Sequence, residues 1–120
     1  PEYLDNRVHG YQVEIAEGKW SGCIYDEARR RRFLNPPEQM TESVTKLLKP
    51  GQWNHYRVIC CGDRILTWVN GTKVTDIRDT TTQEGFIGLQ VHGVGKRTDP
   101  LHVEWKNIRL RELSPEDCPE

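Results

Sequence analysis

Two short segments, residues 10–15 and 87–92, alternate apolar and polar side chains with the period of a β-strand. Their polar positions are Gln12 and Glu14 in the first segment, and Gln90 and His92 in the second. If both strands lie in one sheet, two amides, a carboxylate and an imidazole share one surface, which could form the floor of a polar ligand site. The alternative is a solvated outer face, because an antiparallel sheet commonly has one face in water.

The apolar positions of the same segments predict the core of the protein. We expect these side chains to point inward in a two-sheet antiparallel β-sandwich: Tyr11, Val13, Ile15, Leu89 and Val91. Strand-like segments separated by Gly, Pro and Asn recur along the chain, which indicates an all-β fold.

The clearest further element is a β-hairpin, in which residues 63–69 and 72–77 flank Asn70-Gly71, the favoured pair for a type I′ turn. A strand over residues 53–60 precedes it and completes a three-stranded meander. The last predicted strand covers residues 103–113, with a β-bulge at Asn107 where the alternation changes phase.

Residues 26–49 do not fit the strand pattern. The basic run Arg29–Arg32 lies beside Asp26 and Glu27, which favours a salt-bridged surface loop over a phosphate or nucleic-acid site. Apolar residues at helical spacing predict a short amphipathic helix of about three turns: Met40, Val44, Leu47 and Leu48.

Composition narrows the classes of partner. The 17 Lys and Arg nearly cancel the 18 Asp and Glu, so no global field attracts the chain to nucleic acid. No apolar run approaches the roughly 20 residues of a spanning helix, so we expect no membrane span. The length of 120 residues suits one domain.

Six segments, read in order, resemble one known family. They are 10–15 (GYQVEI), 21–27 (SGCIYDE), 50–54 (PGQWN), 68–71 (WVNG), 85–93 (GFIGLQVHG) and 106–113 (KNIRLREL). The family is a bacterial one named for 3-keto-disaccharide hydrolases. The resemblance implies a concanavalin A-like jelly roll over residues 1–113, followed by a polar tail over 114–120.

Two departures from the family pattern stand out. Family domains usually carry further N-terminal strands, and nothing before Tyr11 matches them, so we expect either a sandwich lacking its first strands or one that closes differently. Many members also have Glu at position 12 and Gln at position 14, whereas this chain has Gln12 and Glu14. The carboxylate is therefore displaced by roughly 7 Å along the strand.

The resemblance implies an enzyme that cleaves 3-keto-glucosides by hydrolysis or elimination, with a carbohydrate as its partner and a periplasmic or secreted location in a bacterium. A ketone at C3 acidifies the C2 proton, so cleavage needs a base for that proton and an acid for the departing oxygen. Glu14 and His92 are the catalytic candidates, in either order.

The remaining site residues would bind the substrate: Gln12, Tyr25, Asp26, Gln90 and Lys96. Tyr25 and Asp26 join this site only if their loop folds over it, and the alternative for Lys96 is an ordinary solvent-facing lysine. Trp20, Trp53 and Trp68 are large enough to stack on a sugar face, although a jelly roll also needs large core residues. The cofactor question stays open: Glu14, His92 and Asp26 would suit a divalent metal ion, and the sequence contains no established metal-binding motif.

Two other function classes stay open. The same sandwich can serve as a non-catalytic, lectin-like carbohydrate-binding module, or as an interaction domain without a small ligand. Ionisable groups at Glu14 and His92 favour catalysis, because amides and aromatic rings suffice for sugar binding alone.

Overall fold

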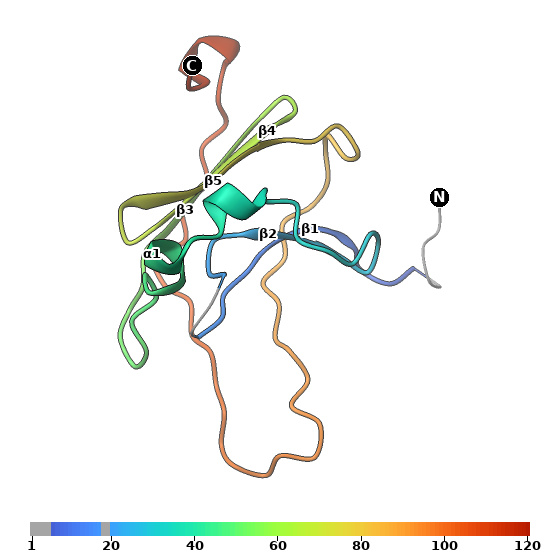
Figure 1. Ribbon diagram of the computed structural model, residues 1–120. Coiled ribbons are helices and arrows are strands. Elements are labelled where there is room, and N and C mark those ends of the chain that lie inside the picture. Colours follow the sequence, from blue (N-terminus) through green and yellow to red (C-terminus); the bar gives the residue numbers. More distant parts are fainter. Residues whose placement is uncertain (1–5, 18–19) are drawn as a thin grey trace. The chain divides into compact units, whose positions relative to one another are not determined.

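The computed structural model describes residues 6–17 and 20–120, and its regular structure is almost entirely β (Figure 1). The chain divides into two units, residues 1–83 and 84–120, and each is described by itself. No helix among the described residues is long and apolar enough to cross a membrane.

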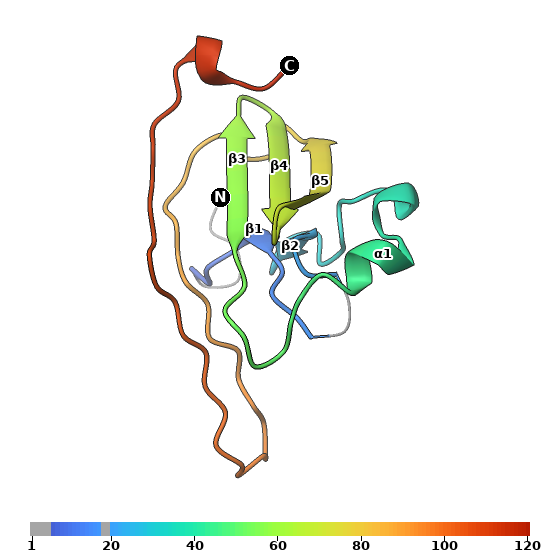
Figure 2. The same ribbon diagram turned by 90° about the vertical axis from the view of Figure 1, so that its left-hand side faces the viewer.

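The first unit contains two antiparallel sheets, which confirms the predicted fold class. One sheet pairs β1 (Gly10–Val13) with β2 (Ile24–Glu27), and Gln12 lies opposite Tyr25 in its register. The other has the order β3-β4-β5, formed by β3 (Tyr56–Cys61), β4 (Arg64–Val69) and β5 (Thr72–Arg78). This meander is the one predicted, and Figure 2 shows its three strands side by side.

The turn between β4 and β5 has the backbone that the Asn-Gly pair predicts. Asn70 has φ of 49° and Gly71 has φ of 85°, and a type I′ turn requires positive φ at both positions. The Asn70 side chain also accepts a hydrogen bond from the backbone N–H of His55 at 2.9 Å and so fixes the start of β3.

The helices are short. The predicted amphipathic helix is the single turn α1 (Glu42–Thr45), shorter than the three turns expected because the flanking backbone leaves the helical region at Thr41 and Lys46. Two 3₁₀ turns complete the set, η1 (Pro37–Gln39) and η2 (Pro115–Asp117), the latter with a capping box between Ser114 and Asp117.

The core of the first unit lies where the two sheets face each other. Ile24 of β2 packs with Ile65 and Ile77, and Tyr11 and Val13 lie against this cluster, as predicted. A second cluster joins Cys23 to Val69 and Val74, and residues from the segment around α1 cover it: Met40, Val44 and Leu47.

Gly22 connects the sheets through a close backbone approach. Its φ is 85°, and a Cβ atom at this position would lie 2.7 Å from the Val69 side chain. Its carbonyl accepts hydrogen bonds from two buried hydroxyls, those of Thr67 and Thr75. Only glycine fits this turn, which holds the beginning of β2 against β4 and β5.

The prediction of inward-facing side chains is wrong for Ile15, Leu89 and Val91. Ile15 follows the end of β1 and is 49% exposed, while Leu89 and Val91 are 53% and 71% exposed. Residues 87–92 and 103–113 are extended but belong to no strand, contrary to prediction. Alternation sets which face of a strand is apolar, whereas a strand also needs a hydrogen-bonded neighbour, which the pattern does not specify.

The predicted irregularity at Asn107 does occur. Asn107 has φ of 54°, so the backbone turns out of the extended conformation where the alternation changes phase. The feature is a left-handed residue within an extended segment, and it is not a bulge, because a bulge requires a partner strand.

Candidate functional site

Gln12 lies in β1, Glu14 follows directly after its end, and the two side chains are joined by a hydrogen bond. The Gln12 amide Nε2 donates a hydrogen bond of 2.8 Å to Glu14 Oε2, and both residues are half-buried. Among the described residues no hydrogen bond reaches Glu14 Oε1. The hydrogen bond from Gln12 therefore fixes the position of the Glu14 carboxylate.

Aromatic side chains extend this face away from β1. Tyr25 lies opposite Gln12, and such neighbours have Cβ atoms about 4.5–5.5 Å apart. Phe33 bridges to Tyr25 with ring centroids 5.2 Å apart, and Trp20 lies 4.8 Å from Phe33. We call the surface formed by Gln12, Glu14, Tyr25, Phe33 and Trp20 the Glu14 face.

Trp20 occupies a strained backbone position beside this face. Its φ is 63°, a region that bulky residues rarely adopt. The following residue, Ser21, holds the loop by accepting from the Ala16 N–H at 3.0 Å and donating to the Ala16 carbonyl at 2.7 Å. Strain of this kind is concentrated at ligand sites.

Two further titratable side chains are near Glu14 in the interior. The backbone N–H of Glu14 donates to the Cys23 carbonyl at 2.9 Å, and Tyr56 packs against the cluster that contains Cys23. Burial, reinforced by the Glu14 charge, raises the pKa of the Cys23 thiol to about 11. Cys23 is therefore a neutral core residue at neutral pH and not a nucleophile.

Asp26 lies in a separate group of charged residues. Its side chain is fully buried, and Arg29 Nε donates to Asp26 Oδ1 at 2.8 Å. Arg30 pairs with the other oxygen of Asp26 and, through Nη1 at 2.8 Å, with Asp79. We call the residues Tyr11, Asp26, Arg29, Arg30 and Asp79 the Asp26 network.

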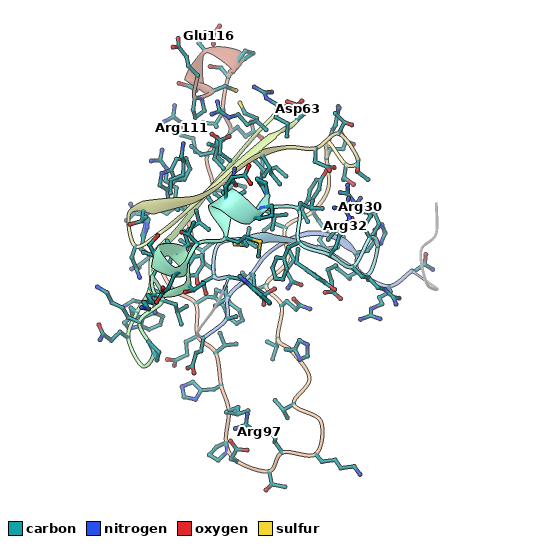
Figure 3. All side chains as sticks on the ribbon, viewed as in Figure 1. Arg30, Arg32, Asp63, Arg97, Arg111 and Glu116 are labelled. Atoms are coloured by element: carbon teal, nitrogen blue, oxygen red, sulfur yellow. The ribbon has the colours of Figure 1, made fainter. Side chains whose placement is uncertain are left out.

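Tyr11 completes this network from β1. Its hydroxyl donates to Asp79 and accepts from the backbone N–H of Thr82 at 3.3 Å, while the Arg29 guanidinium lies 5.1 Å from the centre of its ring. The expectation of a salt-bridged loop is confirmed for Arg29 and Arg30, of which Arg30 is labelled in Figure 3.

Electrostatics keep both carboxylates of the Asp26 network ionised. Burial alone would raise the pKa of Asp26, but hydrogen bonds from Arg29 and Arg30 lower it below its ordinary value. The Arg30 guanidinium lowers the pKa of Asp79 far below its usual range, with a smaller contribution from the Tyr11 hydroxyl. This arrangement can hold the loop after β2 against the chain that follows β5.

Gln90, His92 and Lys96 belong to the second unit and are exposed. His92 Nδ1 lies 2.6 Å from the carbonyl oxygen of Gly93, and Lys96 follows Gly95 in a turn. A shallow depression of about 180 Å³ is lined by His92 and His102 together with apolar residues of both extended arms: Val91, Val94, Leu101 and Val103.

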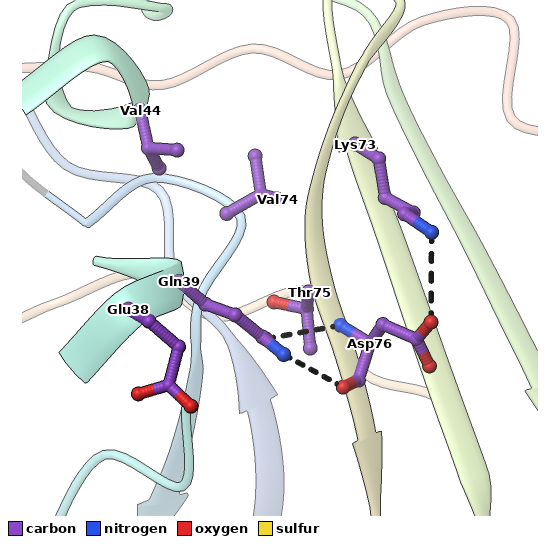
Figure 4. A pocket seen from close by; sticks show the side chains of 7 residues that line it. All are labelled: Glu38, Gln39, Val44, Lys73, Val74, Thr75 and Asp76. Atoms are coloured by element: carbon purple, nitrogen blue, oxygen red, sulfur yellow. Dashed lines mark hydrogen bonds and ion pairs between the residues drawn. The ribbon is translucent and has the colours of Figure 1, made fainter. Parts of the chain in front are cut away.

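A larger open depression of about 360 Å³ lies in the first unit beside β5 (Figure 4). Two of its polar side chains are already bonded: Gln39 Nε2 donates to the Asp76 carbonyl at 2.8 Å, and the Asp76 carboxylate pairs with Arg64 at 2.9 Å. Gln39 thereby covers the edge of β5. We assign this depression to the packing of η1 on the sheet.

No group of three His, Cys, Asp or Glu side chains among the described residues is arranged to hold a metal ion.

The sequence patterns did not indicate Phe33 as a member of the Glu14 face or Tyr56 as its neighbour. Phe33 follows the basic run and Tyr56 follows a polar turn, and neither has a spacing signal, because their contacts with β1 and β2 come from distant segments.

The sequence was compared with proteins of curated function and with models of protein families. No protein of curated function matches the chain. Residues 1–111 match the family model described as a 3-keto-alpha-glucoside-1,2-lyase-like domain. Since this match covers nearly all of the 120 residues, the chain belongs to the 3-keto-alpha-glucoside-1,2-lyase-like family, which confirms the resemblance in its sequence and relates it to carbohydrates.

Proposed function

We propose that this chain cleaves 3-keto-glucosides by acid–base chemistry, with Glu14 as the base. The observation that carries the proposal is the Gln12–Glu14 pair, in which the Gln12 amide donates to one oxygen of the half-buried Glu14 carboxylate at 2.8 Å. The family description supports the class of substrate.

The reaction begins at C2 of the oxidised sugar. The ketone at C3 acidifies the C2 proton, which Glu14 removes while the electron pair of the C2–H bond moves into an enolate. The enolate then forms the C1–C2 double bond and breaks the bond between C1 and the departing oxygen. That oxygen takes a proton from a general acid, for which His92 is the candidate, and a positioned acid or base contributes roughly 10²–10⁴-fold. Addition of water to the resulting enone would make the net reaction a hydrolysis.

The aromatic part of the Glu14 face supports sugar binding beside this carboxylate. Rings of Trp20 and Tyr25 can pack against the apolar face of a pyranose, while the Gln12 amide can bind a hydroxyl group. Gln90 and Lys96 stay proposed substrate-binding residues. Asp26 is proposed to support the site without binding the sugar itself, because its carboxylate already accepts hydrogen bonds from Arg29 and Arg30.

The decisive experiment compares a 3-keto-glucoside with its unoxidised parent, each with and without a chelator. We expect turnover of the keto sugar only, followed as ultraviolet absorbance of the enone. Glu14→Gln keeps the shape and hydrogen bonding of the side chain but removes the base, so kcat should fall about 10²-fold or more. Loss of activity with the chelator would add a metal ion to the mechanism.

Glu27→Gln is the matched control, because Glu27 lies in the same sheet and its carboxylate pairs with Arg7 at 3.4 Å on the surface. It should leave kcat unchanged. Equal turnover of both sugars would contradict a role for the C3 ketone. Binding of the keto sugar without turnover would instead identify the chain as a carbohydrate-binding module.

A further inference from the structure

Two of the four outer sheet edges in the first unit are covered. Residues 32–35 run along the outer edge of β2, where the Leu34 N–H donates to the Ile24 carbonyl at 2.8 Å. Gln39 covers β5 in the same way: its side-chain amide donates to the Asp76 carbonyl at 2.8 Å and accepts from the Asp76 N–H at 3.1 Å. The amide thus takes the place of a peptide group of a neighbouring strand, and protection of this kind prevents unwanted strand pairing.

The outer edge of β1 has no such cover. The Glu14 N–H donates to the Cys23 carbonyl at 2.9 Å, in the direction of β2. Because the direction of the backbone groups alternates along a strand, Tyr11 and Val13 direct their N–H and C=O groups away from β2. Among the described residues no hydrogen bond reaches these four groups. A strand could therefore pair with β1 at this edge.

Strand β3 has both an uncovered edge and an uncovered face. The Asn70 N–H donates to the His55 carbonyl at 2.8 Å, so by alternation Val58 and Cys60 direct their backbone groups away from β4. Cys60 lies opposite Ile65, whose side chain is in the core, and Val58 shares this face. Yet Val58 is 44% exposed and Cys60 is exposed. The core face of the meander therefore continues onto β3, where nothing in the described part of the unit covers it.

The two uncovered edges lie on the same side of the first unit. The chain after β2 reaches the edge of β5, because Asn35 Nδ2 donates to Thr75 Oγ1 at 2.8 Å and Gln39 bonds Asp76. Strand β2 is therefore on the β5 side, and β1, which pairs with the opposite edge of β2, is on the β3 side (Figure 2). The protein covers the edges on one side and leaves those on the other side open.

We propose that two copies of this chain associate through this open side, with β3 of each copy placed beside β1 of the other. The paired edges then form backbone hydrogen bonds, as in strand addition. The uncovered face of one β3 lies against that of the other, so Val58 and Cys60 of both copies become buried. These side chains carry no charge, which suits them to a dry interface. A two-fold axis relates the two contacts, and the assembly closes at two copies.

The test is sedimentation of the full chain over a series of concentrations, which does not depend on the proposed activity. We expect a concentration-dependent dimer. Val58→Asp should raise the dimer Kd about 10²-fold or more, because each dimer would bury two unpaired carboxylates. Its urea midpoint at low concentration should equal that of the wild type, because Val58 is exposed in the single copy. Ile108→Asp is the matched control, since Ile108 is 68% exposed in the second unit, and it should leave Kd unchanged.

Hydrogen exchange locates the interface. The amides of Tyr11, Val13 and Val58 should exchange more slowly as the concentration of the wild type rises, and Val58→Asp should abolish this protection. A wild type that sediments as a monomer at every concentration would overturn the proposal. An equal Kd in Val58→Asp, or an equal rise in Ile108→Asp, would overturn it as well, since another surface would then hold the copies together. Dimers without protection of the edge amides would refute the pairing of β3 with β1, and a lower urea midpoint of dilute Val58→Asp would show that Val58 is already covered in the single copy.

Discussion

The Asp26 network and the Glu14 face use the same small sheet but satisfy their polar groups to different degrees. Asp26 is fully buried, and its two oxygens accept hydrogen bonds from Arg29 and Arg30. On the Glu14 face, by contrast, the Glu14 carboxylate is half-buried, and the one hydrogen bond that reaches it from a side chain among the described residues comes from the Gln12 amide.

This difference separates a structural cluster from a candidate ligand site. Buried charges that are fully paired hold elements together, because their partners are supplied by the fold itself. A half-buried carboxylate held by a neutral amide, by contrast, keeps its charge near the surface, where a ligand with hydroxyl groups can bind it. Substitutions in the two regions should therefore have opposite effects on stability and activity.

The largest effect on stability should come from Asp26→Asn. This change leaves the Arg29 guanidinium, whose side chain is only 7% exposed, without its counter-charge. We expect the free energy of unfolding, measured with urea, to fall by about 3 kcal/mol. The control is Asp63→Asn, because the Asp63–Arg78 pair is exposed and a pair of this kind contributes only about 0–1 kcal/mol. Equal losses in the two variants would contradict the structural role of the network.

A smaller effect should appear in the acid dependence of stability. The pKa of Asp79 is lower in the folded protein than in the unfolded chain, so the folded state is favoured above the ordinary pKa of about 4 and this advantage disappears as pH falls. We expect Tm of the wild type to decrease from about pH 5 to about pH 2 more steeply than Tm of Asp79→Asn. Parallel curves in calorimetry would show that Asp79 contributes no such linkage.

The smallest effect should be on substrate affinity at the Glu14 face. Trp20→Ala removes a ring that is 37% exposed, and we expect KM for the 3-keto-glucoside to rise about fivefold with kcat nearly unchanged, as for loss of about 1 kcal/mol of stacking. Trp53→Ala is the comparison, because Trp53 lies in the turn before β3. If Trp53→Ala raised KM and Trp20→Ala did not, the sugar would bind elsewhere.

Local features of the fold were predictable from the sequence. The β4–β5 hairpin follows from Asn70-Gly71, whose backbone angles the fold reproduces, and the polar face of β1 follows from alternation. Both depend on residues that are neighbours along the chain. The predicted pairing of Gln12 and Glu14 on one face is likewise a local property of a strand.

Features that depend on distant segments were not predictable. The alternation of residues 87–92 specifies an apolar face but no neighbouring strand, so Leu89 and Val91 were wrongly placed in the core. Phe33 and Tyr56 join the environment of Glu14 through contacts across many residues, which one sequence does not reveal. Asp26 gave a partial signal, since the adjacent arginines indicated ion pairs but not that they would be buried.

The carbonyl of Gly22 has a consequence for the order of folding. Its two hydrogen bonds, from Thr67 and Thr75, join residues that are 45 and 53 positions apart, whereas the meander β3-β4-β5 forms from adjacent segments. Local contacts cost less loop-closure entropy, so the meander should form first and the β1–β2 sheet should dock on it later. Replacing Thr75 with Val should then accelerate unfolding and hardly change the folding rate, because the Gly22 contact belongs to the late part of the pathway.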